Sequence, residues 1–299
     1  MNNIAQNQNS GQALRELLAQ RTLYSKAKRI TLAQFGLAVA APGALILAEF
    51  YHPDLKAWTA LTAIVITFVN EAVLEPIKGS VREQAAKIQE AFDSRVLEMP
   101  WSDLRAGPPV EREEIVELAD INSNTDALRD WYSPDVAAAS LPIGRLMCQR
   151  TNCFWDSTLR RRYRALIAGI LIVVSIGLIA FALWRDLAMV DFVLSIAVPV
   201  LPFLLWSFKE MREHSEAADR LDRLRSFVTN CWRQILAGTI AESDLVQAST
   251  QLQDAIFDHR RRSPLVFDWL YRWLKKSLQE NADSSAREML QELRDKGRL

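Results

Sequence analysis

The sequence predicts an all-α integral membrane protein with four transmembrane helices, which form two hairpins with helical cytoplasmic extensions. Residues 165–184 carry no charge over twenty positions, and a helix of that length covers roughly 30 Å, the thickness of a bilayer's hydrocarbon core. A second apolar block covers residues 32–77, while the 36 basic and 36 acidic side chains crowd into the other segments. With 49% hydrophobic residues, this segregation is typical of a helical membrane protein rather than of a soluble domain.

The chain begins with a polar segment, residues 1–31, which we expect to be cytoplasmic and mobile because it is rich in Asn and Gln. Residues 32–77 form the first predicted transmembrane hairpin, in which spans 32–51 and 57–77 are joined by the polar turn His52–Lys56. Some thirty residues precede this block and a second span follows it directly. A cleaved signal peptide is therefore not predicted here.

The second span has a polar face. Six of its side chains fall within roughly half of a helical wheel at 100° per residue: Thr59, Thr67, Asn70, Glu71, Glu75 and Lys78. A carboxylate inside the hydrocarbon core, such as that of Glu71, costs roughly a few kcal/mol if it faces lipid. It must therefore face protein or water. One interpretation is a cation-attracting pore built from several copies, lined by Thr67, Asn70, Glu71 and Glu75. In the plainer interpretation, Glu75 marks the membrane boundary and Glu71 snorkels or pairs with a basic neighbour.

Residues 78–164 form a predicted central cytoplasmic helical segment. An apolar stripe at helical spacing continues the second span until Pro100-Trp101, and it consists of Val81, Ala85, Ile88, Phe92 and Val96. We expect a short helix over Glu111–Ile121, an aromatic loop over 130–134, and an amphipathic helix over Leu141–Arg164 that leads into the third span.

Residues 165–208 form the second predicted hairpin, and residues 209–299 a cytoplasmic C-terminal helical region. The fourth span continues as an apolar stripe that ends near Gly238, and the pattern then predicts helices over Ser243–His259 and Pro264–Gln279 and a separate helix from Ser284. Residues 267–276 mix aromatic, aliphatic and basic side chains. Such a segment either lies on a membrane surface or docks on neighbouring helices, and docking is favoured.

The distribution of Lys and Arg predicts the orientation, because cytoplasmic loops retain positive charge. Basic residues flank the outer ends of both hairpins, among them Arg160, Arg161 and Arg162, whereas the two turns offer only Lys56 and Arg185. Both termini and the central segment should therefore be cytoplasmic. The three arginines are topology determinants that can also contact anionic lipid.

Motifs of common enzymes are absent from the sequence. It has no P-loop, no dinucleotide-binding glycine motif, no H-E-x-x-H and no G-x-S-x-G, so an enzyme is not predicted. The spacing of Cys148, Cys153 and Cys231 fits reduced cytoplasmic thiols rather than a metal site or disulfides. A net charge of zero gives no argument for a DNA or RNA duplex as partner.

Four motifs carry a family resemblance. They are Gln20–Lys28 (QRTLYSKAK), Ala85–Asp93 (AAKIQEAFD) with Pro100-Trp101, Asp130–Pro134 (DWYSP), and Cys148–Asp156 (CQRTNCFWD) followed by Leu159–Tyr163 (LRRRY). Their order and their positions relative to the predicted spans resemble the SMODS-associated four-transmembrane effector family of bacteria. The similarity covers roughly residues 15–280.

The resemblance implies a pore-forming or membrane-disrupting effector of the bacterial inner membrane, encoded beside a cGAS/DncV-like nucleotidyltransferase in anti-phage defence. Such an effector responds to a cyclic oligonucleotide, so that the infected cell dies or stops growing. We expect a homo-oligomer in the bilayer with no bound cofactor other than this ligand. The alternative is a non-conducting membrane-anchored sensor or scaffold that recruits a partner through its cytoplasmic helices.

A cyclic oligonucleotide needs cations for its phosphates and flat side chains for its bases. The central segment offers candidates of both kinds: Lys87, Arg145 and Arg150 for phosphates, and Trp131, Tyr132 and Trp155 for bases. The alternative for each aromatic residue is a place in the hydrophobic core.

Overall fold

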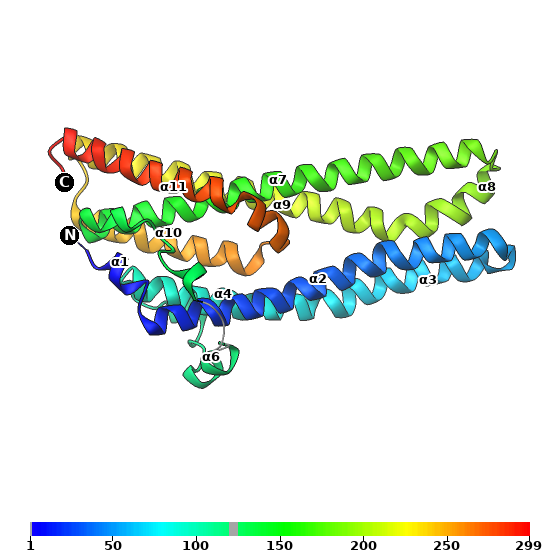
Figure 1. Cartoon of the computed structure of the whole chain (residues 1–299), viewed down its shortest axis with the longest axis horizontal. Coiled ribbons are helices and arrows are strands. Elements are labelled where there is room, and N and C mark those ends of the chain that lie inside the picture. Colours follow the sequence, from blue (N-terminus) through cyan, green and yellow to red (C-terminus); the bar gives the residue numbers. More distant parts are fainter. Residues whose placement is uncertain (1, 120–124) are drawn as a thin grey trace.

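The computed structural model describes residues 2–119 and 125–299, and these residues form helices and loops without any strand. Figure 1 shows an elongated molecule in which the long helices run along the long axis. Both termini lie at the same, thicker end. The predicted all-helical fold is confirmed for this part of the chain.

The first hairpin consists of α2 (Gly11–Tyr51) and a returning helix in three parts: α3 (Lys56–Val69), the π-helical segment η2 (Asn70–Leu74) and α4 (Glu75–Val96). The short 3₁₀ turn η1 (Pro53–Leu55) joins the two arms. As Figure 1 shows, α2 lies beside α3 and α4 over their whole length.

The second hairpin pairs α7 (Leu141–Trp184) with α8 (Met189–Phe192), the π-helical segment η5 (Val193–Ala197) and α9 (Val198–Ala237). Beyond it, α10 (Glu242–Arg262) and α11 (Asp268–Asp295) fold back along the thick end of the molecule (Figure 1). The remaining elements are short, and they are α1 (Ile4–Asn7), α5 (Asp103–Ala106), α6 (Arg112–Leu118), η3 (Asp126–Leu128) and η4 (Pro134–Ala138).

Among the described residues, three helices are long and apolar enough to cross a membrane: Ala57–Val96, Leu141–Trp184 and Met189–Ala237. Large apolar side chains on them remain exposed, such as Phe68 at 71% and Leu183 at 77%. Exposed apolar surface on this scale is what lipid covers in a membrane protein. The chain is thus a helical membrane protein, although α2, which contains the expected first span, is not among the three.

The predicted continuations of the spans into the thick end are confirmed. The α4 stripe from Ala85 to Val96 is buried, as is the α9 stripe from Ala218 to Ile235 except for the half-buried Leu224. Helix α9 ends where predicted, because Gly238 takes the left-handed conformation at φ +69° that closes a helix. The stripes of α4, α7 and α9 pack together with α10 and α11 into one core, which we call the helical bundle.

Two expectations about the chain ends are wrong. The separate C-terminal helix from Ser284 is part of α11, since residues 268–295 contain no Gly or Pro and the buried series Leu278, Ala282 and Ala286 continues through that position. The N-terminal segment is packed rather than mobile. Ile4 is buried, and the Asn2 amide donates to the Val136 carbonyl at 2.8 Å.

The short helix expected over Glu111–Ile121 is observed as α6, Arg112–Leu118, and Ile121 lies outside the described residues. Both π-helical segments were missed by the sequence analysis. Each of them ends two residues before a proline, Pro76 or Pro199. A proline lacks the N–H of a regular turn and crowds the carbonyl four residues earlier, and a widened turn relieves that clash.

Candidate functional site

The two hairpins meet at a cluster of polar side chains, which we call the junction cluster: Gln34, Glu71, Glu75, Lys78 and Lys209. The buried Lys78 ammonium lies 2.8 Å from a Glu75 carboxylate oxygen and donates to the side-chain oxygen Oε1 of Gln34 at 3.0 Å. The Gln34 amide donates in turn to Glu75 at 3.1 Å. These contacts join α2 to α4 within the first hairpin.

Lys209 links this cluster to the second hairpin. Its ammonium on α9 lies 2.9 Å from a Glu71 carboxylate oxygen and 3.6 Å from a Glu75 oxygen. Two carboxylates thus share two ammonium groups, which makes the cluster electrically neutral. Paired charges of this kind can remain near a membrane boundary at little cost.

The four candidate pore residues therefore have defined partners within one chain. Thr67 donates its hydroxyl to the Ala63 carbonyl at 2.9 Å, and the Asn70 amide donates to Glu71 at 3.1 Å. Glu71 and Glu75 face Lys209. The plainer interpretation, in which Glu71 pairs with a basic neighbour, matches this arrangement of a single copy.

A second polar network lies inside the helical bundle, and we call it the bundle network. Asp93 is fully buried, and its carboxylate accepts from Arg260 at 2.5 Å and from the Tyr132 hydroxyl at 2.6 Å. The Gln253 amide bridges Asp93, at 3.1 Å, and Glu90, at 2.8 Å. Burial and the nearby Asp93 charge raise the pKa of Glu90 to about 8. The network joins α4, α10 and the aromatic loop.

Two of the six candidate ligand residues are occupied by structural contacts. Tyr132 is buried, and beyond its bond to Asp93 it receives a 2.9 Å hydrogen bond from the Asn152 amide. Arg145 donates to the carbonyls of Leu97, at 2.7 Å, and Glu98, at 2.5 Å, where α4 ends. In this conformation both side chains stabilise the fold.

The other four candidates fall into separate groups. Arg150 and Trp155 both contact α11: Arg150 donates to the Ser285 hydroxyl at 2.8 Å, and the Trp155 indole donates to the Leu278 carbonyl at 3.1 Å. Trp131 packs edge-on against Phe92, with ring centroids 6.3 Å apart. Lys87 lies near Gly107. The structure therefore brings Arg150 and Trp155 to one element and places the others elsewhere.

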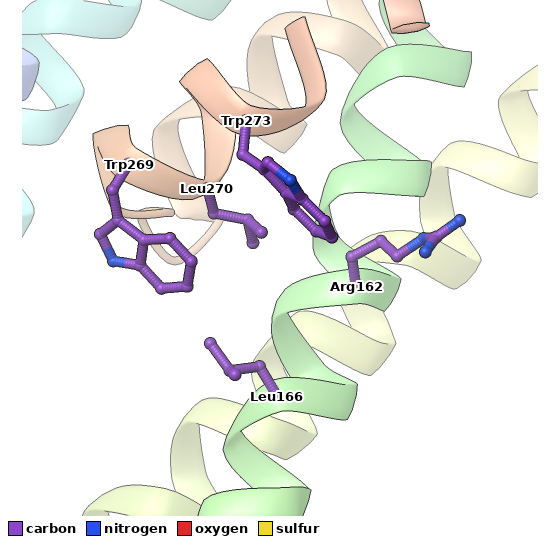
Figure 2. A pocket seen from close by; sticks show the side chains of 5 residues that line it. All are labelled: Arg162, Leu166, Trp269, Leu270 and Trp273. Atoms are coloured by element: carbon purple, nitrogen blue, oxygen red, sulfur yellow. The ribbon is translucent and has the colours of Figure 1, made fainter.

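The three topology arginines have different surroundings. Arg160 is buried and donates to the Pro264 carbonyl at 2.8 Å, while Arg161 pairs with Asp222 on α9. Arg162 is exposed and borders a hollow of about 540 Å³ between α7 and α11, whose walls are Leu166, Trp269, Leu270 and Trp273 (Figure 2). Neighbouring positions in one basic run thus serve packing, pairing and exposed surface.

Comparison with known proteins identifies the family. The family model described as the SMODS-associating 4TM effector domain matches residues 2–289. The chain belongs to this family. The resemblance read from the sequence motifs is confirmed.

A relative from Bacillus cereus (strain VD146), described as a probable CBASS effector molecule, is 24% identical to this chain over 281 residues. The aligned region covers 91% of this chain and 93% of that protein. No solved structure matches this chain.

The structure shows where the motifs that carry the family resemblance lie in the fold. The motif Ala85–Asp93 supplies Glu90 and Asp93 to the bundle network, and the motif Asp130–Pro134 supplies Tyr132. Sequence analysis missed the two acids as a pair. The available signal was their three-residue spacing on a helix stripe that is otherwise apolar, since such a position buries whatever side chain it carries.

Proposed function

We propose that this protein is a pore-forming effector of bacterial anti-phage defence that breaches the inner membrane when a cyclic oligonucleotide binds it. Membership of the SMODS-associating 4TM effector family supports the defence role, and the relative described as a probable CBASS effector points to a cyclic oligonucleotide signal. The apolar helices support action in the membrane. Breach of the membrane then arrests or kills the infected cell, and no catalysis by this chain is involved.

We place four spans in the membrane, with both termini and the central segment in the cytoplasm. Helix α2 lies beside α3 as far as the turn between them, and the termini and α6 lie at the opposite, thick end (Figure 1). Inside the membrane part, α2 presents a buried stripe of small and polar side chains, Thr31, Gln34, Ala38 and Pro42. A helix that packs closely along an apolar partner crosses the bilayer with it.

The single observation that carries the pore mechanism is the junction cluster. Lys209 on α9 holds the carboxylates of Glu71 and Glu75 on the first hairpin. If the hairpins part, both carboxylates lose this partner, and a charge near the membrane boundary is then stable only against water. In a homo-oligomer this exposes rings of carboxylates, which attract cations. The described structure is then the closed state.

The trigger acts on the helical bundle. Among the six candidate residues, Arg150 and Trp155 are the pair that one element, α11, already brings together, and a nucleotide there would compete for their contacts with Ser285 and Leu278. Tyr132 and Arg145 could reach a ligand only after their present hydrogen bonds break. We therefore assign the first contact to Arg150 and Trp155, with Lys87 and Trp131 as outlying candidates.

The test is dye and cation release from liposomes that contain the purified protein, challenged with a panel of cyclic di- and trinucleotides. We expect one nucleotide to cause release, Arg150→Ala to abolish it, and Lys209→Gln to cause release without nucleotide. Glu71→Gln should lower the preference for cations over anions, whereas Glu83→Gln, which changes an exposed acid on α4, should not. Unchanged selectivity in Glu71→Gln would remove this residue from the pore.

No release despite tight nucleotide binding would instead favour the membrane-anchored sensor or scaffold. That alternative makes a separate prediction, because its cytoplasmic helices need only to be held at the membrane. They would then keep their activity when attached to an unrelated anchor.

A further inference from the structure

The first turns of α11 have two different faces. Leu270 and Leu278 are buried, and Leu270 packs against Leu159, Tyr163 and Ile167 of α7. The opposite face exposes two tryptophans, Trp269 at 49% and Trp273 at 69%. The expected docking of this segment is therefore observed for one face only, and the other face needs an explanation because large exposed aromatic side chains mark interaction surfaces.

This outer face also carries positive charge. Arg272 and Lys276 are exposed, and the positions 269, 272, 273 and 276 follow one side of a helix. Neither cation has a hydrogen bond or ion pair with any described residue, and the same holds for Arg162 across the hollow. The acid at the start of the helix, Asp268, is already paired with Lys28. The surface is thus apolar in the middle and basic at its rim.

Figure 2 shows how the hollow is built. Trp269 and Trp273 project from α11 on either side of Leu270, while Leu166 and Arg162 come from neighbouring turns of α7, with Arg162 beside Trp273. The uncharged run of α7 begins at Ala165, so Leu166 lies in the first turn of the span and Arg162 one turn before it. The hollow therefore opens at the depth of the lipid headgroups, where Trp, Lys and Arg are enriched.

We propose that this hollow seats an anionic phospholipid of the cytoplasmic leaflet, with its acyl chain against Leu166, Trp269 and Trp273 and its phosphate at Arg162. The inference rests on the membrane placement proposed above. Charge complementarity selects this occupant, since Arg162 lines an apolar hollow whose other walls carry no acid, and Arg272 and Lys276 add positive charge on the same face of α11. A second copy of the chain would need acidic side chains to meet the same three cations.

The lipid would also act on the candidate sensor. The first turns of α11 form a wall of the proposed lipid site. Further along the same helix, Leu278 and Ser285 accept hydrogen bonds from Trp155 and Arg150. One rigid helix thus connects the membrane surface with the first contact assigned to the nucleotide. Bound lipid should hold α11 in its resting position.

Native mass spectrometry of the full-length protein in detergent tests the proposal, with phosphatidylglycerol or phosphatidylcholine added and no nucleotide present. We expect the wild-type protein to retain phosphatidylglycerol preferentially and Arg162→Gln to bind it about fivefold more weakly, the effect of one basic residue at an anionic surface. Trp273→Ala should weaken retention of both lipids, because it removes a wall of the hollow. Arg161→Gln removes the same charge one position away, on a side chain paired with Asp222, and should bind like the wild type.

Equal lipid retention in Arg162→Gln and Arg161→Gln would contradict the proposed lipid-binding site. It would also be overturned if Trp269→Ala and Trp273→Ala converted an oligomer to monomers with lipid retention unchanged, since the surface would then be an interface between copies. The proposed pore function fails separately, because it predicts release from liposomes on addition of nucleotide. Lipid binding without such release would support the proposed lipid site and contradict the proposed pore.

Discussion

Glu90 is a carboxyl group buried in the helical bundle next to a second acid, Asp93, and a single guanidinium, Arg260. Arg260 lies 2.5 Å from Asp93 and 3.8 Å from Glu90, so Asp93 has the stronger partner. Two carboxylates and one cation would leave an uncompensated charge in the core. The protein avoids this because the raised pKa of Glu90, about 8, keeps that acid protonated at neutral pH.

This raised pKa predicts that the protein loses stability as the pH rises from about 6.5 to 8. The folded pKa of Glu90 lies above the ordinary value of 4.5, so the folded state holds a proton that the unfolded state has released. His259 acts oppositely, since burial lowers its pKa from 6.5 to about 4, but that effect ends near pH 6.5. Thermal unfolding midpoints of the purified protein should fall across this window, and those of Glu90→Gln should fall less.

Glu83→Gln is the matched control, because Glu83 is an exposed acid on the same helix. It should keep the pH dependence of the wild type. Identical slopes for Glu90→Gln and the wild type would mean that Glu90 is ionised in the folded protein.

Single residues also show what sequence alone could predict. The polar face of the second span was predicted, because helical spacing is local information. Its partner Lys209 was not predicted, because Lys209 lies 138 positions from Glu71 in the sequence. Only the packing of the two hairpins brings the two side chains together. Chemical type alone predicts Tyr132 and Arg145 as ligand contacts, whereas their burial and hydrogen bonds depend on tertiary contacts that residue type does not encode.

At the scale of elements, apolar periodicity predicted α4, α7 and α9 well, because their stripes are built from large aliphatic and aromatic side chains. It failed on α11 around Ser284, where the buried positions are occupied by alanine, at 282 and 286. Small side chains give a weak hydrophobic signal even when they pack closely. The π-helical segments left no periodic signal, and only Pro76 and Pro199 mark them.

Continuity of α11 makes Ser284→Pro a discriminating substitution. Inside a helix, proline removes a backbone hydrogen bond and clashes with the preceding turn, which costs about 3 kcal/mol or more. At the first position of a separate helix it would be tolerated. We expect a lower thermal midpoint and less helical circular dichroism for Ser284→Pro, and no such change for Ser284→Ala. Equal stability of the two variants would indicate a break in α11 at this position.

On the scale of the whole molecule, the long helices belong to two regions at once. Helices α7 and α9 continue from the apolar end into the helical bundle without a break, apart from the π-helical segment that precedes α9 (Figure 1). A rigid helix transmits a displacement at one end to the other. In the proposed function, a change in the bundle therefore moves the junction cluster, where Lys209 on α9 holds the carboxylates of the first hairpin.

Three free cysteines can report such a change, because all of them are buried in the bundle: Cys148, Cys153 and Cys231. Burial raises the pKa of Cys153 to about 12 and that of Cys148 well above its ordinary value, and the reactive species is the thiolate. We expect negligible reaction of the resting protein with a maleimide at neutral pH, read out as the mass of the intact chain.

Addition of the activating nucleotide should make these thiols react if α7 and α9 separate from α10 and α11. Ser80→Cys, at an exposed position of α4, provides a thiol that should react in both states and so controls for the reagent. Comparing thiol labelling with release from liposomes then shows which part of the molecule moves. Release from liposomes while all three native thiols remain protected would contradict a motion that begins in the bundle. The hairpins would then have separated while the bundle stayed closed. Labelling that develops together with release would mean that both ends of the long helices move in one transition.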